Sequence, residues 1–216
     1  EESLSELWRI SRAGEGLSRL AALPPESTSD FRSRAQIGTR NLFFLSTAET
    51  VELWATNGTT GGTGSIAAWP STAGYVDALA FAAYRDRLFF LLDSGAAGQS
   101  ELWRTDGTPA GTEIAARLPA GRSGYSLSAR ATPLGLYFIA GRAELPAELW
   151  RSDGTQAGTF VLYPPATGVT GQGVVEFTFF RDRILLSATG EATGAELSQT
   201  FGTPSSTSFA ADLRPG

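Results

Sequence analysis

The sequence predicts an all-β protein, a β-propeller or a section of one, built from four-stranded antiparallel blades. Three observations predict this class: a motif that recurs about every 48 residues, four short apolar runs in each interval, and no sustained helical periodicity. The 216 residues can bury a core, and the 25 Gly and 11 Pro indicate many turns.

The main repeat is a Glu-Leu step followed by a tight turn. Its five copies begin at Glu6, Glu52, Glu101, Glu148 and Glu196. A Trp follows two residues later in four copies, at Trp8, Trp54, Trp103 and Trp150. The fifth copy has Ser198 in that place. The turn reads NGTTGGT, DGTPAGT, DGTQAGT and FGTPSST in the last four copies, and the first copy, ELWRISRAGEG, lacks it.

A second landmark recurs at about the same interval. It reads LFF at 42–44, LFF at 88–90, LYF at 136–138 and ILL at 184–186. Each interval holds four strand-like runs, which in 75–119 are YVDALAFAAY, DRLFFLLDS, ELWRTDG and GTEIAARLP. Since one sheet cannot cover both of its faces, we expect the blades to pack face to face, with the repeated Trp and the LFF runs between them.

The third strand and its turn have the clearest local pattern. Alternation in ELWRT places Glu101 and Trp103 on one face and Leu102 and Arg104 on the other. The Asp-Gly step suits a tight hairpin, because Gly tolerates positive φ and the Asp carboxylate accepts a nearby backbone N–H. Asn57-Gly58-Thr59 also matches a glycosylation acceptor, but its place in the repeat indicates the same turn.

The stretches ELWRTDGTPAGT and ELWRSDGTQAGT resemble the ELWxxDGT repeat family of bacterial, often exported or surface-associated proteins. The closing ADLRPG also resembles the segment after the last strand in that family. The resemblance covers essentially the whole chain, with departures at Asn57, Ser198 and Phe201. It implies a propeller-like repeat fold and an extracytoplasmic location, and no particular reaction.

The repeats predict a single propeller region over 1–216 with four and a half blades. The expected units are a half blade at 4–23 and full blades at about 30–70, 75–119, 125–165 and 172–216. The half blade lacks its first two strands, and the chain contains no Met. We therefore expect a part of a larger propeller, with about seven or eight blades, or one that another chain completes. Closure as a ring of four or five blades would contradict this.

Composition excludes several chemistries. The chain has no His, no Cys and no Lys, because all of its 17 basic residues are Arg. Thiolate and imidazole catalysis, most zinc or haem ligation, Schiff bases and phosphate-binding Gly-Lys loops are therefore excluded. A net charge of −5 argues against nucleic-acid binding, and no apolar run is long enough to span a membrane. We expect a non-enzymatic protein that uses no cofactor.

Two sets of carboxylates could be sites, and both are expected to be structural. Asp106 and Asp153 could ligate Ca²⁺, but each turn offers one carboxylate where calcium needs six to eight oxygens. The five repeated Glu residues could be catalytic acids, but one per blade would lie too far apart for paired chemistry. We expect them to pair with Arg104 or Arg151 across strands.

Contact residues are expected where the repeats differ. Trp69, outside the motif, is expected to be exposed. Alignment on the LFF landmark places several first-strand residues at equivalent positions: Arg32, Arg34, Ala80, Ser126, Ser128 and Glu176. The residues expected to make contacts are Trp69, Arg32, Arg34 and Glu176. The predicted function is a protein-binding scaffold or accessory subunit of a surface or membrane-associated assembly, and the alternative is a carbohydrate-binding or carbohydrate-active propeller.

Overall fold

The computed structural model describes residues 5–11, 16–70, 79–93, 100–119, 129–132, 135–142, 145–163, 173–190 and 194–211. The predicted all-β class is confirmed. Helical structure in these ranges consists of two short 3₁₀ turns, Thr60–Gly62 and Pro204–Ser206. Ser126 and Ser128, two of the first-strand positions aligned on the LFF landmark, lie outside the described residues.

The strands form one two-stranded and four four-stranded antiparallel sheets in the described ranges. The half sheet contains β1 (Glu6–Ile10) and β2 (Leu17–Ala22). The first sheet contains β3 (Thr28–Ile37), β4 (Arg40–Ser46), β5 (Thr50–Thr56) and β6 (Thr63–Pro70). The second contains β7 (Leu79–Tyr84), β8 (Arg87–Asp93), β9 (Ser100–Thr105) and β10 (Glu113–Arg117). The third contains β11 (Ala129–Thr132), β12 (Gly135–Arg142), β13 (Leu145–Ser152) and β14 (Phe160–Tyr163). The fourth contains β15 (Val174–Phe180), β16 (Arg183–Gly190), β17 (Gly194–Thr200) and β18 (Ser208–Ala211).

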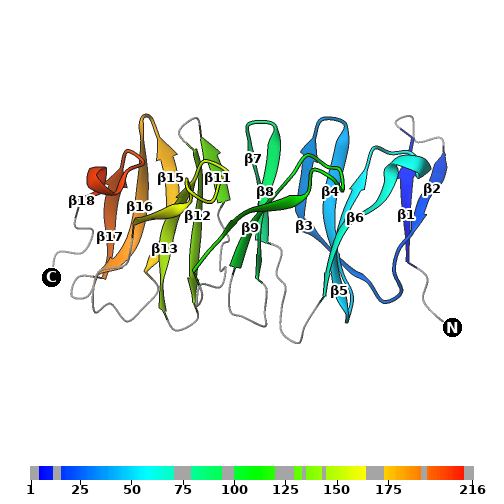
Figure 1. The fold of residues 1–216 in the computed structure, drawn as a ribbon, viewed down its shortest axis with the longest axis horizontal. Coiled ribbons are helices and arrows are strands. Elements are labelled where there is room, and N and C mark those ends of the chain that lie inside the picture. Colours follow the sequence, from blue (N-terminus) through cyan, green and yellow to red (C-terminus); the bar gives the residue numbers. More distant parts are fainter. Residues whose placement is uncertain are drawn as a thin grey trace.

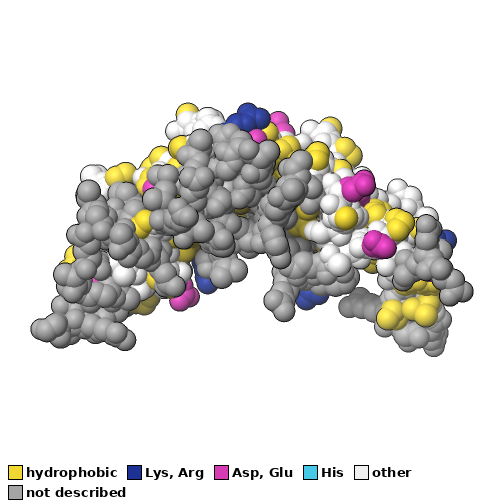
Figure 2. All heavy atoms as spheres, turned by 90° about the horizontal axis from the view of Figure 1, so that it is seen from below, with side chains coloured by type: hydrophobic (Ala, Val, Ile, Leu, Met, Phe, Trp, Pro, Cys, Tyr) yellow, Lys and Arg dark blue, Asp and Glu magenta, His cyan; other side chains and the backbone are white. Residues whose placement is uncertain are grey.

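The five sheets stand side by side in chain order, with the two termini at opposite ends of the row (Figure 1). Figure 2 shows that the row is bowed into an arc. The first strands of consecutive sheets approach one another, β3 against β7 and β7 against β11, as blades do around a propeller axis. Within the described residues, no strand of the half sheet pairs with the fourth sheet, so hydrogen bonds do not close the row into a ring.

The hydrophobic core is divided among the sheet boundaries. Phe44, Leu53 and Phe90 belong to the cluster between the first and second sheets. Phe89, Phe138 and Trp150 belong to the next cluster, between the second and third sheets. The cluster between the third and fourth sheets includes Tyr137, Leu149, Phe177 and Leu186. The second strands of the first three sheets therefore contribute apolar side chains to both neighbouring sheets, which explains their unbroken apolar runs.

The LFF landmark is out of register in the first sheet. Phe43 lies opposite Trp54, whereas Phe90, the last residue of its LFF run, lies opposite Trp103. The hairpin after β4 is shorter than the one after β8, so the pairing shifts by one residue. Since residues 42–45 are all apolar, either register fills both faces of the strand, and the sequence pattern conceals the shift.

Candidate functional site

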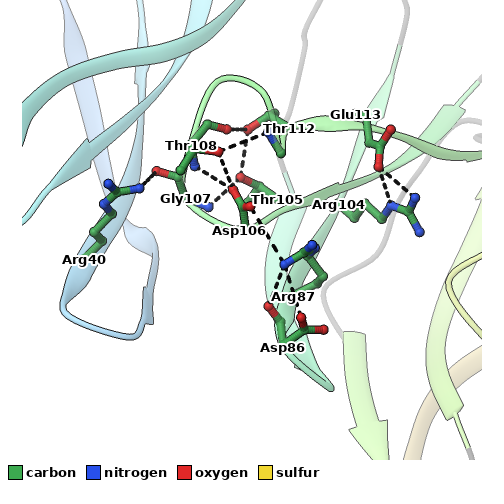
Figure 3. Close-up of polar contacts among 11 residues, drawn as sticks. Arg40, Asp86, Arg87, Arg104, Thr105, Asp106, Gly107, Thr108, Thr112 and Glu113 are labelled. Atoms are coloured by element: carbon green, nitrogen blue, oxygen red, sulfur yellow. Dashed lines mark hydrogen bonds and ion pairs between the residues drawn. The ribbon is translucent and has the colours of Figure 1, made fainter.

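The Asp-Gly-Thr turn of the second sheet is closed by its own side chains (Figure 3). The Asp106 carboxylate accepts the Thr108 N–H at 2.9 Å and the Thr108 hydroxyl at 2.6 Å. The Thr108 hydroxyl oxygen in turn accepts the Gly111 N–H at 3.0 Å. Gly107 has φ +83°, as the sequence predicted. The carboxylate therefore caps the turn, in the manner expected of an Asp in this position.

The first and third sheets repeat this turn with Asn57 and Asp153. Asn57 Oδ1 accepts the Thr59 N–H at 3.0 Å, which confirms that this segment is a turn. Asp153 Oδ1 accepts the Thr155 N–H at 2.9 Å. In all three turns a Cβ added to the Gly five residues after the Asp or Asn would lie 2.0–2.1 Å from the side-chain oxygen. The carboxylate or amide occupies the space that any other residue would need.

The fourth sheet makes the same turn with a different pair of residues. Phe201 replaces the Asp, and Ser206 replaces the Gly five residues later. The Ser206 hydroxyl accepts the Phe201 N–H at 3.1 Å and the Thr203 N–H at 3.2 Å. It thus supplies the acceptor that the missing carboxylate supplies elsewhere. The departure at Phe201 is compensated within the same turn.

Each turn also joins its sheet to the preceding one through an Arg. Arg40 of β4 donates to the Gly107 carbonyl at 2.7 Å (Figure 3). Arg9 donates to the Gly58 carbonyl at 2.9 Å. Arg104 donates to the Gly154 carbonyl at 3.2 Å. Arg151 donates to the Gly202 carbonyl. We call these four contacts the Arg–turn latches, and no pattern in the sequence predicted them.

The glycine of each turn is needed for the latch as well as for its backbone angle. A Cβ on Gly154, which has φ +93°, would lie 3.0 Å from the Phe89 ring of the second sheet. A Cβ on Gly107 would lie 3.1 Å from Ile37 of the first sheet. The turn can approach the neighbouring sheet this closely only without a side chain. The repeated motif is therefore part of the inter-sheet contact.

The Glu and Trp of the motif bind each other. The indole Nε1–H donates to the carboxylate two residues earlier, at 3.1 Å for Trp8, 2.7 Å for Trp54, 3.0 Å for Trp103 and 3.1 Å for Trp150. Glu101 also pairs with Arg117 at 3.0 Å, whereas Arg104 pairs with Glu113. The repeated Glu was predicted to pair across strands with Arg104 or Arg151, and in the second sheet its partner on the neighbouring strand is Arg117 instead. The carboxylate satisfies an indole N–H that burial would otherwise leave without water.

Three motif tryptophans lie in the core or at its border, and one does not. Trp54 and Trp150 are buried, and Trp103 is packed against the cluster between the first and second sheets. Trp8 is 48% exposed, so the prediction of a core position is wrong for this copy. Its indole lies on the face of the half sheet where the described residues supply no neighbouring sheet.

Trp69 is not the exposed contact residue that the sequence suggested. It lies at the end of β6 and packs edge-to-face on Trp103 at 5.1 Å and on Phe90 at 6.0 Å between ring centroids. Both partners belong to the second sheet. The fourth strand of a sheet reaches the Trp of the next one, so Trp69 belongs to the core between sheets although it lies outside the motif.

Arg34 and Glu176 are exposed but not equivalent. Arg34 lies opposite Phe43, which faces the motif Trp54. Glu176 lies opposite Ser187, one residue after Leu186, which faces the equivalent Ser198. The predicted equivalence is wrong, because it depended on the LFF landmark that is out of register. They also lie in the first and fourth sheets, with two sheets between them. Arg32 lies in β3, and the structure does not describe the side chains of Arg32 or Ala80.

Metal ligands are not gathered in the described part of the chain, where no group of three or more Asp or Glu side chains is placed to hold an ion. In Asp106 and Asp153, a carboxylate oxygen instead accepts a backbone N–H within the turn. No helix within the described ranges is long and apolar enough to cross a membrane.

A groove of about 460 Å³ lies between the half sheet and the first sheet. We call it the edge groove. It is lined by Leu7, Arg34, Ala35, Gln36, Asn41, Leu42, Phe43 and Thr56. Residues of the half sheet and its end cover part of the first sheet: Leu7, Ala21 and Leu23 pack against Phe43, Leu45 and Trp54. Within the half sheet, β1 pairs with β2. Arg34 is thus the predicted contact residue that the structure places in a recess.

The turn carboxylates make the free energy of unfolding depend on pH in the acid range. The hydrogen bond from the Thr108 hydroxyl, more than any other favourable contact, holds the pKa of Asp106 below its ordinary value of 3.8, and Thr155 does the same to the pKa of Asp153. A carboxyl whose pKa is lower in the folded state than in the unfolded state stabilises the fold at pH values above its unfolded-state pKa. This contribution is lost as the pH falls through its folded-state pKa. The variant Asp106→Asn/Asp153→Asn keeps the turn that Asn57 already makes. We expect it to lose less unfolding free energy between about pH 5 and pH 2 than the native chain in urea titrations.

The control for this prediction removes two charges elsewhere. Glu26→Gln/Glu49→Gln changes exposed carboxylates outside the repeated Asp-Gly-Thr turns. Its stability should follow the native acid profile. An acid profile of the double Asn variant that matches the native one would contradict the role given to the two turn carboxylates.

The chain matches no protein-family model, and no curated protein sequence resembles it significantly. It is similar to the solved structure of puromycin hydrolase, with a TM-score of 0.55 and 14% identity over 92% of this chain and 30% of that one. The S511A mutant of puromycin hydrolase complexed with PGG has a TM-score of 0.54 and 14% identity, over 95% of this chain and 31% of that one. The S577A mutant of prolyl oligopeptidase B from Galerina marginata, bound to a 35mer substrate, has a TM-score of 0.51 and 13% identity. The match covers 90% of this chain and 28% of that one.

This chain spans about a third of the length of those structures. The domains that it matches are β-propellers. At this level of identity the likeness concerns the fold alone. It agrees with the arrangement of the sheets, and the chain is accordingly an all-β protein with a β-propeller-like repeat fold.

Proposed function

We propose that this protein is a non-catalytic, protein-binding propeller section, and that the edge groove receives an extended segment of the partner. The observation that carries the proposal is the edge groove itself, a recess of about 460 Å³ lined mainly by residues of β1, β3 and β4. A groove bordered by strands is a common docking site for an extended peptide.

The groove has the composition of such a docking site. Leu7 and Phe43 give it an apolar floor, and Arg34, Gln36 and Asn41 are exposed polar residues at its border. The Arg34 guanidinium favours a partner segment that carries a carboxylate. The hydrophobic floor would contribute the affinity, and the polar border would fix the register.

Two further features support a scaffold over the alternative functions. The chain has no His, Cys or Lys, which removes the usual nucleophile–base pairs from its own residues. Trp69, the tryptophan expected to be exposed, is packed against Trp103 and Phe90, which disfavours the carbohydrate-binding alternative. We propose an extracytoplasmic location and a role as an accessory subunit of a surface or membrane-associated assembly, on the basis of the resemblance to the ELWxxDGT repeats. Fractionation of the source cells would test the location.

Site-specific photo-cross-linking tests the groove. A photoreactive amino acid at Gln36, inside the groove, should give a cross-link to a separate protein in the native source. The same amino acid at Ser65, exposed on the same sheet, should give none. Asn41→Arg, which fills the groove, should abolish the cross-link, whereas Thr39→Arg in the adjacent exposed turn should leave it unchanged.

Two results would overturn this proposal. A cross-link from Gln36 that remains within the chain's own polypeptide would assign the groove to internal packing. A yield that is equal at Gln36 and Ser65, or indifferent to Asn41→Arg, would show that the contact is not specific to the groove.

A further inference from the structure

The fourth sheet has a pocket where the other sheets have a tryptophan. Its volume is about 310 Å³. We call it the tryptophan slot, and it is lined by Tyr163, Ala188, Glu196, Ser198, Thr207, Ser208 and Phe209. Ser198 occupies the motif position of Trp54, Trp103 and Trp150, and Glu196 remains at the position of the carboxylate that accepts their indole N–H.

Two replacements together produce the open space. In the first three sheets the motif indole stacks on a Phe of the second strand, with ring centroids 6.4 Å apart for Phe43–Trp54, 6.4 Å for Phe90–Trp103 and 6.2 Å for Phe138–Trp150. In the fourth sheet Leu186 lies opposite Ser198. Both aromatic rings of the pair are therefore replaced by smaller side chains, and the strands around them keep the same pairing.

The walls of the slot retain what an indole requires. Tyr163 comes from the third sheet, and Phe209 comes from the outermost strand of the fourth. Phe209 lies opposite Ser198 and is 60% exposed, so an aromatic surface stands at the mouth of the slot. Glu196 is only 7% exposed, and a carboxylate is a strong acceptor for an N–H donor in such surroundings.

We propose that the tryptophan slot binds the indole ring of a ligand in the way that the other sheets bind their own tryptophan. The ring would lie beside Tyr163 and Phe209 and donate its N–H to the Glu196 carboxylate. The chemistry that the slot recognises is a flat bicyclic aromatic ring with one N–H donor. Such a ring could come from a small indole compound or from a tryptophan side chain of a peptide. This site lies in the fourth sheet, away from the edge groove, and does not depend on the function proposed for that groove.

Binding of simple probes to the folded chain tests the proposal. Indole should bind and shift the backbone NMR signals of Ser198, Ser208 and Phe209. 1-Benzothiophene has nearly the same shape without the N–H, and it should bind at least about tenfold more weakly, because the hydrogen bond to Glu196 is lost. Equal affinity for the two probes, or signal changes confined to other sheets, would overturn the proposal.

Three variants separate the slot from nonspecific binding. Ser198→Trp fills the slot with the residue that the repeat normally has, and it should abolish indole binding. Glu196→Gln keeps the shape of the carboxylate and should weaken indole more than benzothiophene. Thr178→Ala, an exposed position on the first strand of the same sheet and outside the slot lining, should leave the affinity unchanged. If Ser198→Trp does not fold, Ser198→Phe serves the same purpose, and binding that persists in a folded filled-slot variant would overturn the proposal.

The source of the ring is settled by a second probe. A short capped peptide with one central Trp is compared with free indole. Tighter binding of the peptide would identify a partner's tryptophan as the natural occupant, and binding of indole alone would identify a small molecule. Both outcomes support an indole site, whereas failure of both probes would overturn it.

Discussion

Phe138→Ala is expected to lower the free energy of unfolding by about 3–5 kcal/mol. The Phe138 side chain is fully buried between the second and third sheets, where it stacks on Trp150 with ring planes 11° apart. Its removal leaves a cavity at a boundary between two sheets. Each sheet contributes rigid aromatic and aliphatic groups there, so the surroundings can collapse only in part.

Urea unfolding followed by circular dichroism measures this loss, and Phe209→Ala is the matched control. Phe209 is the same residue type on an outer strand and is 60% exposed, so its truncation should change stability by no more than about 0.5 kcal/mol. In thermal unfolding, Phe138→Ala should lower Tm by about 10 °C for a chain of this length. A loss similar to that of Phe209→Ala would mean that the sheets do not pack on each other as described.

Gly111→Ser is expected to destabilise the chain by about 1–3 kcal/mol, although the fourth sheet has a serine in the same place. A Cβ on Gly111 would lie 2.1 Å from Asp106 Oδ1, so the carboxylate and the new side chain compete for one site. Ser206 causes no such conflict, because Phe201 replaces the Asp there. The effect of a serine therefore depends on the residue five positions before it.

A double-mutant cycle shows this dependence directly. Asp106→Phe alone removes the turn acceptor, whereas Asp106→Phe/Gly111→Ser rebuilds the turn of the fourth sheet. Arg87 Nη1 lies 3.9 Å from Asp106 Oδ2, and in the fourth sheet Arg183 Cζ lies 4.8 Å from the centroid of the Phe201 ring. A Phe at position 106 would therefore have an Arg neighbour like that of Phe201. We expect the double variant to be more stable than either single variant, with a coupling of about 1 kcal/mol or more. Additive losses would show that Ser206 does not replace the Asp.

The turn and the strand pattern could be predicted from sequence because they depend on local chemistry. The positive φ of Gly107 and the capping role of Asp106 require only the residues of the turn itself. The alternation of Glu101 and Trp103 places both on one face, and the structure joins them by a hydrogen bond. Four strands per repeat followed from counting apolar runs, and the four complete sheets have that number.

Contacts between sheets could not be predicted in the same way. The shift of Phe43 is concealed because four consecutive apolar residues suit either register. Trp69 was expected to be exposed because it lies outside the motif, but the neighbouring sheet covers it. Arg40 and Gly107 are 67 residues apart in sequence, and only the placement of adjacent sheets brings them together.

The departures of the fifth copy were visible in the sequence, but their consequences were not. Ser198 and Phe201 read as two similar losses from one motif. The structure separates them, because Ser206 restores the turn at Phe201 whereas a pocket stands beside Ser198. Whether a substitution is compensated depends on which side chains the fold places around it, and this set includes Tyr163 from another sheet.

The repeated turn holds each sheet to the one before it through an Arg side chain. Hydrogen–deuterium exchange on Arg40→Ala tests this most directly, because Arg40 lies in the first sheet and its acceptor, the Gly107 carbonyl, lies in the second (Figure 3). Arg117→Ala is the control, since it removes a surface Arg that pairs within its own sheet. We predict faster exchange at the amides of Gly107, Thr108 and Gly111 in Arg40→Ala and no change there in Arg117→Ala. Unchanged exchange at these three amides in Arg40→Ala would mean that Arg40 does not hold the turn of the second sheet.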